Sequence, residues 1–302
     1  MNNWTKPNSQ KLILKMFIFG VIFALVAGIL FGLIGPTTKI AYNAGASVGL
    51  AIFLRYAVAT IIILPFIPYQ KNLLSNFKKN IYYFLSISVG SIFLTLGLLT
   101  SVVFIEVSLT ILIFCLYPIY VLLYSIIVDK EKIYLTVKIL FFLTFLGIIL
   151  VLGPSFKVIN LVGIFLAFLA SLGATSMIVT NQKMSLRGIS PIPINIFINV
   201  FNTIFFFVTL KIFFTLNFSF DISIYLLILI PSVCYSFALL SQLIAIPKIG
   251  QSYTALFLYL EPVVGVVGAV FLLKENLETY QIIGASIVII SLLSASFISS
   301  KN

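Results

Sequence analysis

Long apolar runs, separated by short polar segments, are the feature that most restricts how this chain can fold. A bilayer core about 30 Å thick is crossed by about 20 residues of α-helix. Ten such runs are present: 14–34, 47–68, 81–100, 103–127, 133–153, 160–180, 191–213, 222–246, 251–273 and 279–298. Because lipid offers no partner for open backbone groups, each run is expected to be helical. The sequence therefore predicts an all-α integral membrane protein with ten transmembrane helices.

The boundary between the third and fourth runs carries the weakest signal, because only Thr100 and Ser101 mark it. A single helix over 81–127 would be ~70 Å long, which is more than twice the bilayer core of about 30 Å. We therefore place a turn at 100–103. The first run begins beside Lys11 and Lys15, as a signal peptide does. Its apolar stretch is longer than the roughly 7–15 residues of a signal peptide, so we expect it to be retained.

Composition excludes several classes of function. Hydrophobic residues make up 62% of the chain and charged residues 8%, whereas an ordinary soluble domain is about 25% charged. The chain has no His, which excludes His-based acid–base catalysis and His-ligated metals. Cys115 and Cys234 lie far apart in apolar runs, so they are interpreted as buried apolar side chains. We predict no enzymatic activity, no metal and no cofactor.

Basic residues between the runs are divided unevenly between the two sides of the predicted bundle. The side of the amino terminus carries twelve: Lys6, Lys11, Lys15, Lys71, Lys78, Lys79, Lys130, Lys132, Lys183, Arg187, Lys248 and Lys301. The opposite side carries four: Lys39, Lys157, Lys211 and Lys274. Lys and Arg accumulate in cytoplasmic loops, so both termini are predicted to be cytoplasmic. The net charge of +11 is scattered and forms no basic patch of the kind that binds nucleic acid.

An internal repeat relates the fourth run to the ninth. A shift of 144 residues, the difference between Pro118 and Pro262, also places Glu131 on Glu275. Five helices per half are an odd number, so the second half must enter the membrane upside down relative to the first. We therefore predict two inverted five-helix repeats, 14–153 and 160–298. Secondary transporters use this architecture, with a substrate site near the midplane between the halves.

The segments around these matches resemble a known family. Residues 107–118 followed by Glu131 resemble the first signature of this family, and residues 249–262 followed by Glu275 resemble the second. The stretch from residues 31–36 to Arg55 is similar to the part of the family that joins its first and second spans. The family is the EamA-type branch of the drug/metabolite transporter superfamily, and the resemblance covers about 16–298. It implies a ten-helix carrier that moves small metabolites, often outward, without ATP hydrolysis. It also implies a central cavity lined largely by helices 3, 4, 8 and 9.

Charged side chains inside a span are functional candidates, because each costs about 2.5–3.5 kcal/mol to insert. Glu261 lies near the middle of the ninth run beside Pro262, where the proline is expected to kink the helix. Its carboxylate could bind a substrate amine, carry a proton, or hydrogen-bond a neighbouring helix. Arg55 lies roughly 13 Å inside the outer edge of its run, which is the edge where the run begins. It could pair with a substrate carboxylate, with Glu261, or with carbonyls at a helix end.

Uncharged polar residues add further candidates. Tyr117 precedes Pro118 and is the repeat equivalent of Glu261. Tyr235 and Gln242 are seven residues apart on one face of the eighth run, and Asn199 lies on a polar face of the seventh. We interpret all four as candidate substrate-binding residues, with hydrogen bonding between helices as the alternative role.

The repeated prolines and acids are interpreted as a structural signature. Pro118 and Pro262 mark equivalent positions in the fourth and ninth runs. Glu131 and Glu275 are expected to cap the first turns of the fifth and tenth helices, where an acidic group complements the helix dipole.

These features together predict a secondary transporter of the inner membrane. It would move an amino-acid-like or amphiphilic solute, with export as one direction, by alternating access between two states. The expected partners are the small-molecule substrate and the lipid bilayer, and no nucleic acid. One chain would be sufficient, with a dimer left open. The alternative is a membrane binding, accessory or lipid-handling protein that has no transport cycle.

Overall fold

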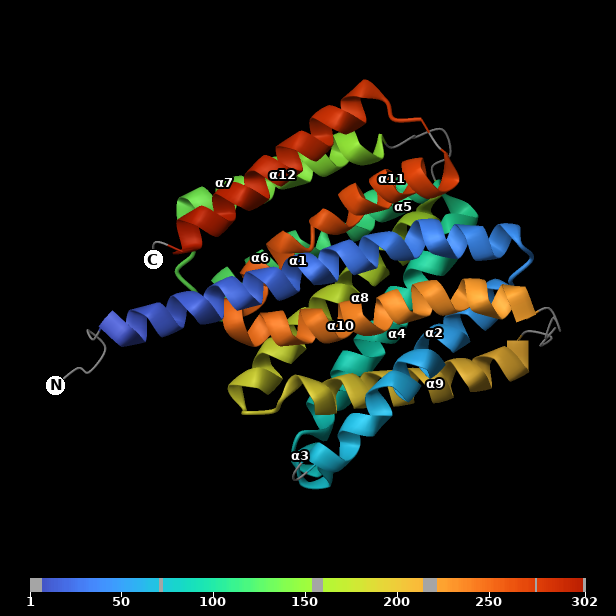
Figure 1. Ribbon diagram of the computed structural model, residues 1–302, viewed down its shortest axis with the longest axis horizontal. Coiled ribbons are helices and arrows are strands. Elements are labelled where there is room, and N and C mark those ends of the chain that lie inside the picture. Colours follow the sequence, from blue (N-terminus) through green and yellow to red (C-terminus); the bar gives the residue numbers. More distant parts are fainter. Residues whose placement is uncertain (1–6, 71–72, 154–159, 214–221, 275, 301–302) are drawn as a thin grey trace.

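The protein is a bundle of α-helices that lie roughly side by side (Figure 1). The structure is a computed structural model, and it describes residues 7–70, 73–153, 160–213, 222–274 and 276–300. Within these ranges there is no β-strand. Nine helical stretches of the described chain are long and apolar enough to cross a membrane, and Leu260–Leu273 is a shorter apolar helix. The predicted all-α membrane fold is therefore confirmed.

The helices follow the predicted order of spans. The first half contains α1 (Pro7–Asn43), α2 (Val48–Ile63), the 3-10 segment η2 (Leu64–Tyr69), α3 (Leu73–Lys79), α4 (Ile81–Phe104), α5 (Val107–Phe114), α6 (Tyr117–Ile127) and α7 (Leu135–Leu152). The second half contains α8 (Leu161–Leu186), α9 (Pro191–Phe213), α10 (Ile222–Phe257), α11 (Leu260–Leu273) and α12 (Thr279–Ser300). The fourth span is thus divided between α5 and α6, and the ninth between the end of α10 and α11.

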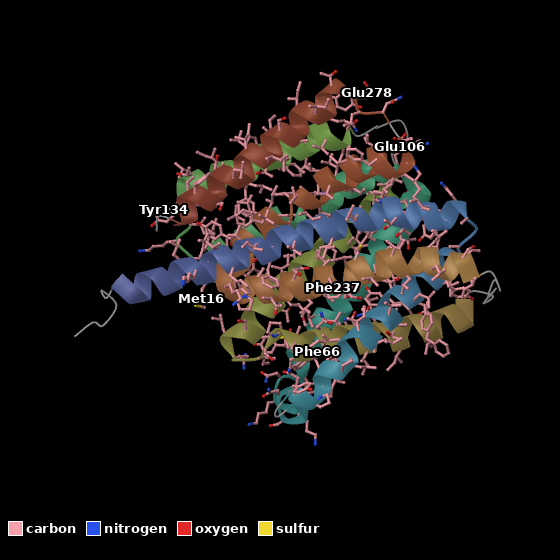
Figure 2. The ribbon with its side chains drawn as sticks, in the orientation of Figure 1. Met16, Phe66, Glu106, Tyr134, Phe237 and Glu278 are labelled. Carbon is pink, nitrogen blue, oxygen red and sulfur yellow. The ribbon has the colours of Figure 1, made fainter. Side chains whose placement is uncertain are left out.

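The two ends of the bundle carry different segments of the chain. The start of α1 and the end of α12 lie at the same end (Figure 1), as an even number of spans requires. Figure 2 places Met16 and Tyr134 toward this end, and Glu106 and Glu278 toward the other. Phe142, Phe165 and Ile290 are each 62% exposed. Such large exposed apolar side chains indicate a surface that faces lipid rather than water.

The two halves contact each other through equivalent positions. A Cβ added at Gly20 of α1 would lie 2.5 Å from Cγ2 of Ile249 in α10. A Cβ added at Gly163 of α8 would lie 2.9 Å from Cγ2 of Ile105, which directly follows α4. Ile249 follows Ile105 by the shift that relates Pro118 to Pro262, and Gly20 and Gly163 correspond within one residue of that shift. Reciprocal contacts of this kind are expected for units related by a two-fold axis.

The turn between the third and fourth spans lies later than the sequence predicted. α4 continues through 100–103 to Phe104, and the chain turns at Ile105 and Glu106, which are both extended. The prediction at 100–103 was wrong because Ser101 serves helix packing. Its buried hydroxyl donates a hydrogen bond of 2.8 Å to the carbonyl of Gly163 in α8.

The first span is also longer than predicted. α1 does not end at residue 34 but continues through Pro36 to Asn43. Proline removes a single backbone donor from a helix, and neighbouring hydroxyl groups make such a loss tolerable in a membrane. The Thr37 hydroxyl donates to the carbonyl of Leu33 at 2.6 Å, next to the Gly32 carbonyl that Pro36 leaves without its helix donor. The Gly-Pro pair therefore lies inside the helix instead of ending it.

Gly250 separates the eighth and ninth spans inside α10. Its backbone angles are φ 79° and ψ 165°, a conformation that is essentially restricted to glycine. The expected break near Lys248 to Gly250 is therefore confirmed. Gly250 follows Glu106 by the repeat shift, so the turns that enter the fourth and ninth spans lie at equivalent positions.

Candidate functional site

The fourth and ninth spans are each interrupted near their middle. α5 ends at Phe114 and α6 begins at Tyr117. In the second half, α10 ends at Phe257 and α11 begins at Leu260. Pro118 and Pro262 lie in the first turn of the restarted helices, where a missing backbone donor has no cost. The prolines thus begin new helices rather than kinking continuous ones.

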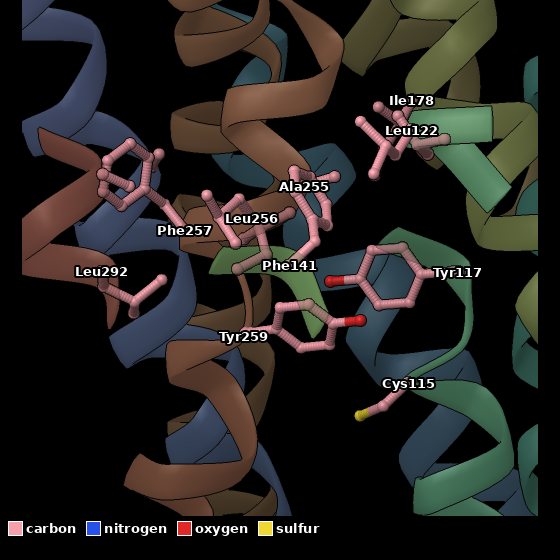
Figure 3. Packing of buried hydrophobic residues seen from close by; sticks show 14 of the residues in the cluster. Cys115, Tyr117, Leu122, Phe141, Ile178, Ala255, Leu256, Phe257, Tyr259 and Leu292 are labelled. Carbon is pink, nitrogen blue, oxygen red and sulfur yellow. The ribbon is translucent and has the colours of Figure 1, made fainter. Parts of the chain in front are cut away.

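Four side chains from the two interruptions lie together. They are Cys115 and Tyr117 from the first half, and Tyr259 and Glu261 from the second. In Figure 3 the hydroxyl groups of Tyr117 and Tyr259 point toward each other, with Cys115 beside them. Glu261 lies in the first turn of α11, two residues after Tyr259. We call these four residues the break site.

Three of the four members of the break site are buried, and Glu261 is partly exposed. Cys115, Tyr117 and Tyr259 are 2%, 4% and 1% exposed. The Tyr259 hydroxyl has no hydrogen-bond partner among the described side chains and backbone groups. A buried polar group without a partner is costly, so this hydroxyl is available to a ligand or to water.

α1 packs directly on the backbone of the second interruption. A Cβ added at Gly28 would lie 3.1 Å from Cβ of Leu260. A Cβ added at Gly32 would lie 2.5 Å from the carbonyl oxygen of Glu261 and 2.7 Å from Cβ of Val264. Small residues spaced by four allow such close approach between membrane helices. α1 therefore fixes the position of the helix turn that carries Glu261.

Two of the predicted candidates, Arg55 and Tyr235, meet in a second cluster. The Arg55 guanidinium carbon lies 5.8 Å from the centre of the Tyr235 ring. The Tyr56 ring contacts Tyr235 edge-to-face at 5.2 Å and stacks on Phe206 at 5.3 Å. The Tyr56 hydroxyl is 2.6 Å from that of Thr95 in α4. This arrangement of α2, α4, α9 and α10 is termed the Arg55 cluster.

The two charged candidates do not form a pair. Among the described residues no ion pair joins Arg55 to Glu261, and the role of Arg55 stays a prediction. Phe31 of α1 lies between the two regions, since it packs on the hydrophobic cores around both. Its ring is 6.4 Å from that of Tyr235. The charges therefore lie in separate parts of the bundle interior.

Gln242 and Asn199 lie outside the break site. Gln242 is 8% exposed on α10. Asn199 is fully buried, and its amide nitrogen donates to Oδ1 of Asn195 at 2.6 Å, within α9. No hydrogen bond of the described chain connects either residue to the break site, so their predicted role in binding stays a prediction.

The expected position of Glu131 at the start of the fifth span was wrong. The residue that precedes α7 is Tyr134, and the backbone N–H of Glu131 instead donates to the Ser125 carbonyl at 2.9 Å. Glu131 follows α6 closely and therefore closes that helix instead of capping the next. Glu275, its repeat equivalent, lies outside the described residues.

Sequence reasoning missed Cys115 and Tyr259 as members of the site. Cys115 was interpreted as an apolar filler, and Tyr259 stands in an apolar run with no polar neighbour except Glu261. The repeat shift pairs Cys115 with Tyr259 just as it pairs Tyr117 with Glu261. The signal was therefore present, in the residues next to the matched prolines.

Ten spans in two inverted halves, with polar side chains at paired helix interruptions, define a multi-pass membrane protein of the class built from inverted repeats. A sequence model of the EamA-like transporter family matches residues 18–153 and again residues 161–297. The chain belongs to this family, whose members are generally transporters.

Two further comparisons bear on the fold. Curated protein sequences contain no match to this chain. Among solved structures, a crystal structure whose description gives no function is similar to this protein, with a TM-score of 0.76 and 13% sequence identity. The similarity covers 92% of this chain and 98% of the other. At this identity it supports the fold alone.

Proposed function

We propose that this protein is a secondary transporter of the inner membrane that moves a small amino-acid-like or amphiphilic solute by alternating access. The observation that carries the proposal is the break site, in which two interrupted helices of opposite orientation bring Tyr117, Tyr259 and Glu261 together. Interrupted helices near the midplane expose backbone groups and polar side chains to a solute. One chain contains both halves of this site.

The charges suggest the class of solute. Glu261 has no cationic partner among the described residues, so a solute amine or a proton would supply the missing positive charge. Arg55 interacts with an aromatic face rather than with a carboxylate, which leaves its charge available to a solute carboxylate. The aromatic rings of Phe31 and Tyr235 lie near Arg55 and could contact an apolar portion of the solute. A small zwitterion fits these features.

Counterflow in proteoliposomes tests this proposal directly. Vesicles that contain the protein are loaded with one unlabelled candidate solute and diluted into the same solute in radiolabelled form. A panel of amino acids, their amides and their amine derivatives should include at least one solute that accumulates transiently above empty vesicles. Binding to detergent-solubilised protein without counterflow of any bound solute would favour the alternative of a non-transporting binding protein.

Replacing Arg55 by glutamine should discriminate between solutes. For a transported solute with a carboxylate, Arg55→Gln is expected to weaken apparent affinity about tenfold, or about 1.4 kcal/mol, while the corresponding amide should be affected less. Arg187→Gln is a matched control, because Arg187 also lies over a tyrosine ring, at 4.6 Å from the centre of Tyr83, but on the surface. Equal losses for the acid and its amide would show that Arg55 acts in packing.

Topology is a second test that needs no solute. The unequal distribution of Lys and Arg predicts cytoplasmic termini. Reporter fusions at both termini should therefore show cytoplasmic activity, and a cysteine introduced at Lys274 should react with an impermeant reagent added outside cells. Periplasmic activity of the carboxyl-terminal fusion would contradict the proposed orientation.

A further inference from the structure

A polar cluster joins the end of α6 to the part of α10 that follows Gly250. The Gln251 amide nitrogen donates to the Ser125 hydroxyl at 2.7 Å and to Oδ2 of Asp129 at 2.7 Å. The Ser252 hydroxyl lies 2.8 Å from that of Ser125. These contacts link the two spans that carry the break site. We call Ser125, Asp129, Gln251 and Ser252 the Gln251 latch.

The latch lies between the break site and the end of the bundle that holds both termini. Ser125 is eight residues after Tyr117, which is about 12 Å along α6. Figure 3 places the Tyr117 ring between Cys115 on one side and Leu122, one turn before Ser125, on the other. Gln251 is 1% exposed and Ser125 is fully buried. The latch and Leu122 thus lie between the break site and the end of the bundle that holds both termini.

The opposite end of the described chain repeats the latch only in part. By the repeat shift Ser252 corresponds to Ser108, whereas Gln251 corresponds to Val107, Ser125 to Ala269 and Asp129 to Leu273. None of these three counterparts has a polar side chain that could form the same bonds. Val107 is also 58% exposed, whereas Gln251 is buried. At that end the Ser101 hydroxyl bonds instead to Thr110 and to the Gly163 carbonyl, so the two ends are held by different polar contacts.

We propose that the Gln251 latch is a cytoplasmic gate, which holds α6 against α10 while the transporter is closed to the cytoplasm. The inference rests on the proposed alternating access. It adds that the state closed to the cytoplasm has a lower free energy than the state closed to the outside. Opening the latch removes hydrogen bonds to a buried amide, which water must replace. In the reverse state Val107, Ala269 and Leu273 would take the places of Gln251, Ser125 and Asp129, and these side chains cannot form the amide bonds of the latch. The conformation with a closed cytoplasmic side is therefore favoured when no solute is bound.

Cys115 provides a native reporter for this gate. In a Cys234→Ala background, Cys115 is the only thiol of the chain. A charged methanethiosulfonate is added to the cytoplasmic face of inside-out membrane vesicles, and modification of Cys115 is followed by mass spectrometry. Gln251→Leu keeps the size of the side chain and removes its donors. It should raise the modification rate about tenfold, equivalent to about 1.4 kcal/mol in the gate equilibrium.

Gln281→Leu is the matched control for this substitution. The Gln281 amide nitrogen also bonds across two helices, to the Val151 carbonyl at 3.1 Å, but between α7 and α12. It should leave the modification rate of Cys115 unchanged. Folded Gln251→Leu protein that reacts at the parental rate would overturn the proposal.

A covalent tie tests the gate by replacing hydrogen bonds of the latch with a bond that can be made and broken. The Ser125 and Ser252 hydroxyls are close enough for Ser125→Cys and Ser252→Cys together to form a disulfide after small side-chain adjustments. Oxidation should suppress modification of Cys115 from the cytoplasmic face, and a reductant should restore it. Equal modification in the oxidised and reduced protein would refute the gate. If Cys115 responds as expected and no solute moves, the proposed transport fails and the gate stands.

Discussion

Replacing Glu261 with glutamine is expected to reduce transport at least about tenfold, or about 1.4 kcal/mol, while the protein still inserts and folds. Glutamine keeps the shape and much of the hydrogen-bonding capacity of the side chain and removes its charge. Glu261 lies in the first turn of α11 at the second helix interruption, and no ion pair of the described residues involves it. A solute amine or a proton that neutralises this carboxylate would have no counterpart in the variant.

The control for this measurement is Glu278→Gln. Glu278 lies in the loop before α12, at the end of the bundle away from the termini (Figure 2). The same change of charge there should leave transport unchanged. The flux of each variant is divided by the amount of folded protein, measured by size-exclusion chromatography in detergent. Normal flux in Glu261→Gln would exclude its carboxylate from solute and proton binding, and loss of folded protein would instead indicate a structural role.

Adding one methyl group at Gly32 should destabilise the protein by about 1–3 kcal/mol, the usual cost of overpacking. Any Cβ there meets the Glu261 carbonyl at 2.5 Å, and the backbone of a helix cannot rotate away as a side chain can. Gly32→Ala should therefore lower the midpoint of thermal unfolding in detergent.

Gly35→Ala is the control for Gly32→Ala on the same helix. An added Cβ at Gly35 meets nothing within 4 Å. Alanine is also favoured over glycine in a helix by about 0.5–1 kcal/mol. The control should therefore be as stable as the parent protein or more stable. Equal midpoints for the two variants would show that α1 and α11 separate easily.

Much of the fold could be predicted because its physical cause acts over whole spans. Each apolar run is long enough to cross a bilayer, and this is visible without knowledge of any contact. The repeat was detectable because prolines and the acidic pair of Glu131 and Glu275 are rare in such a composition. Apolar matches alone would have carried little information in a chain that is 62% hydrophobic.

Local boundaries were harder to predict because a polar residue in a membrane span has two uses. Ser101 was interpreted as the sign of a turn, but its hydroxyl bonds to α8. The interruption before Tyr259 has no polar marker, since Phe257 and Leu258 precede it. The Gln251 latch depends on a contact between residues more than 120 positions apart. Such pairs emerge only when the helices are placed in space.

The close packing of α1 on α10 and α11, and of α8 on α4, has a mechanical consequence. Helices held at backbone contact move together, because close-packed interfaces transmit displacement rather than absorb it. The rigid units of this protein are therefore not its two sequence halves. Each unit combines helices from both, so that a helix of the first repeat travels with its partners from the second. Under the proposed alternating access, a chain cut between the repeats would have to reassemble by exchanging these helices, and neither half alone would contain a complete moving unit.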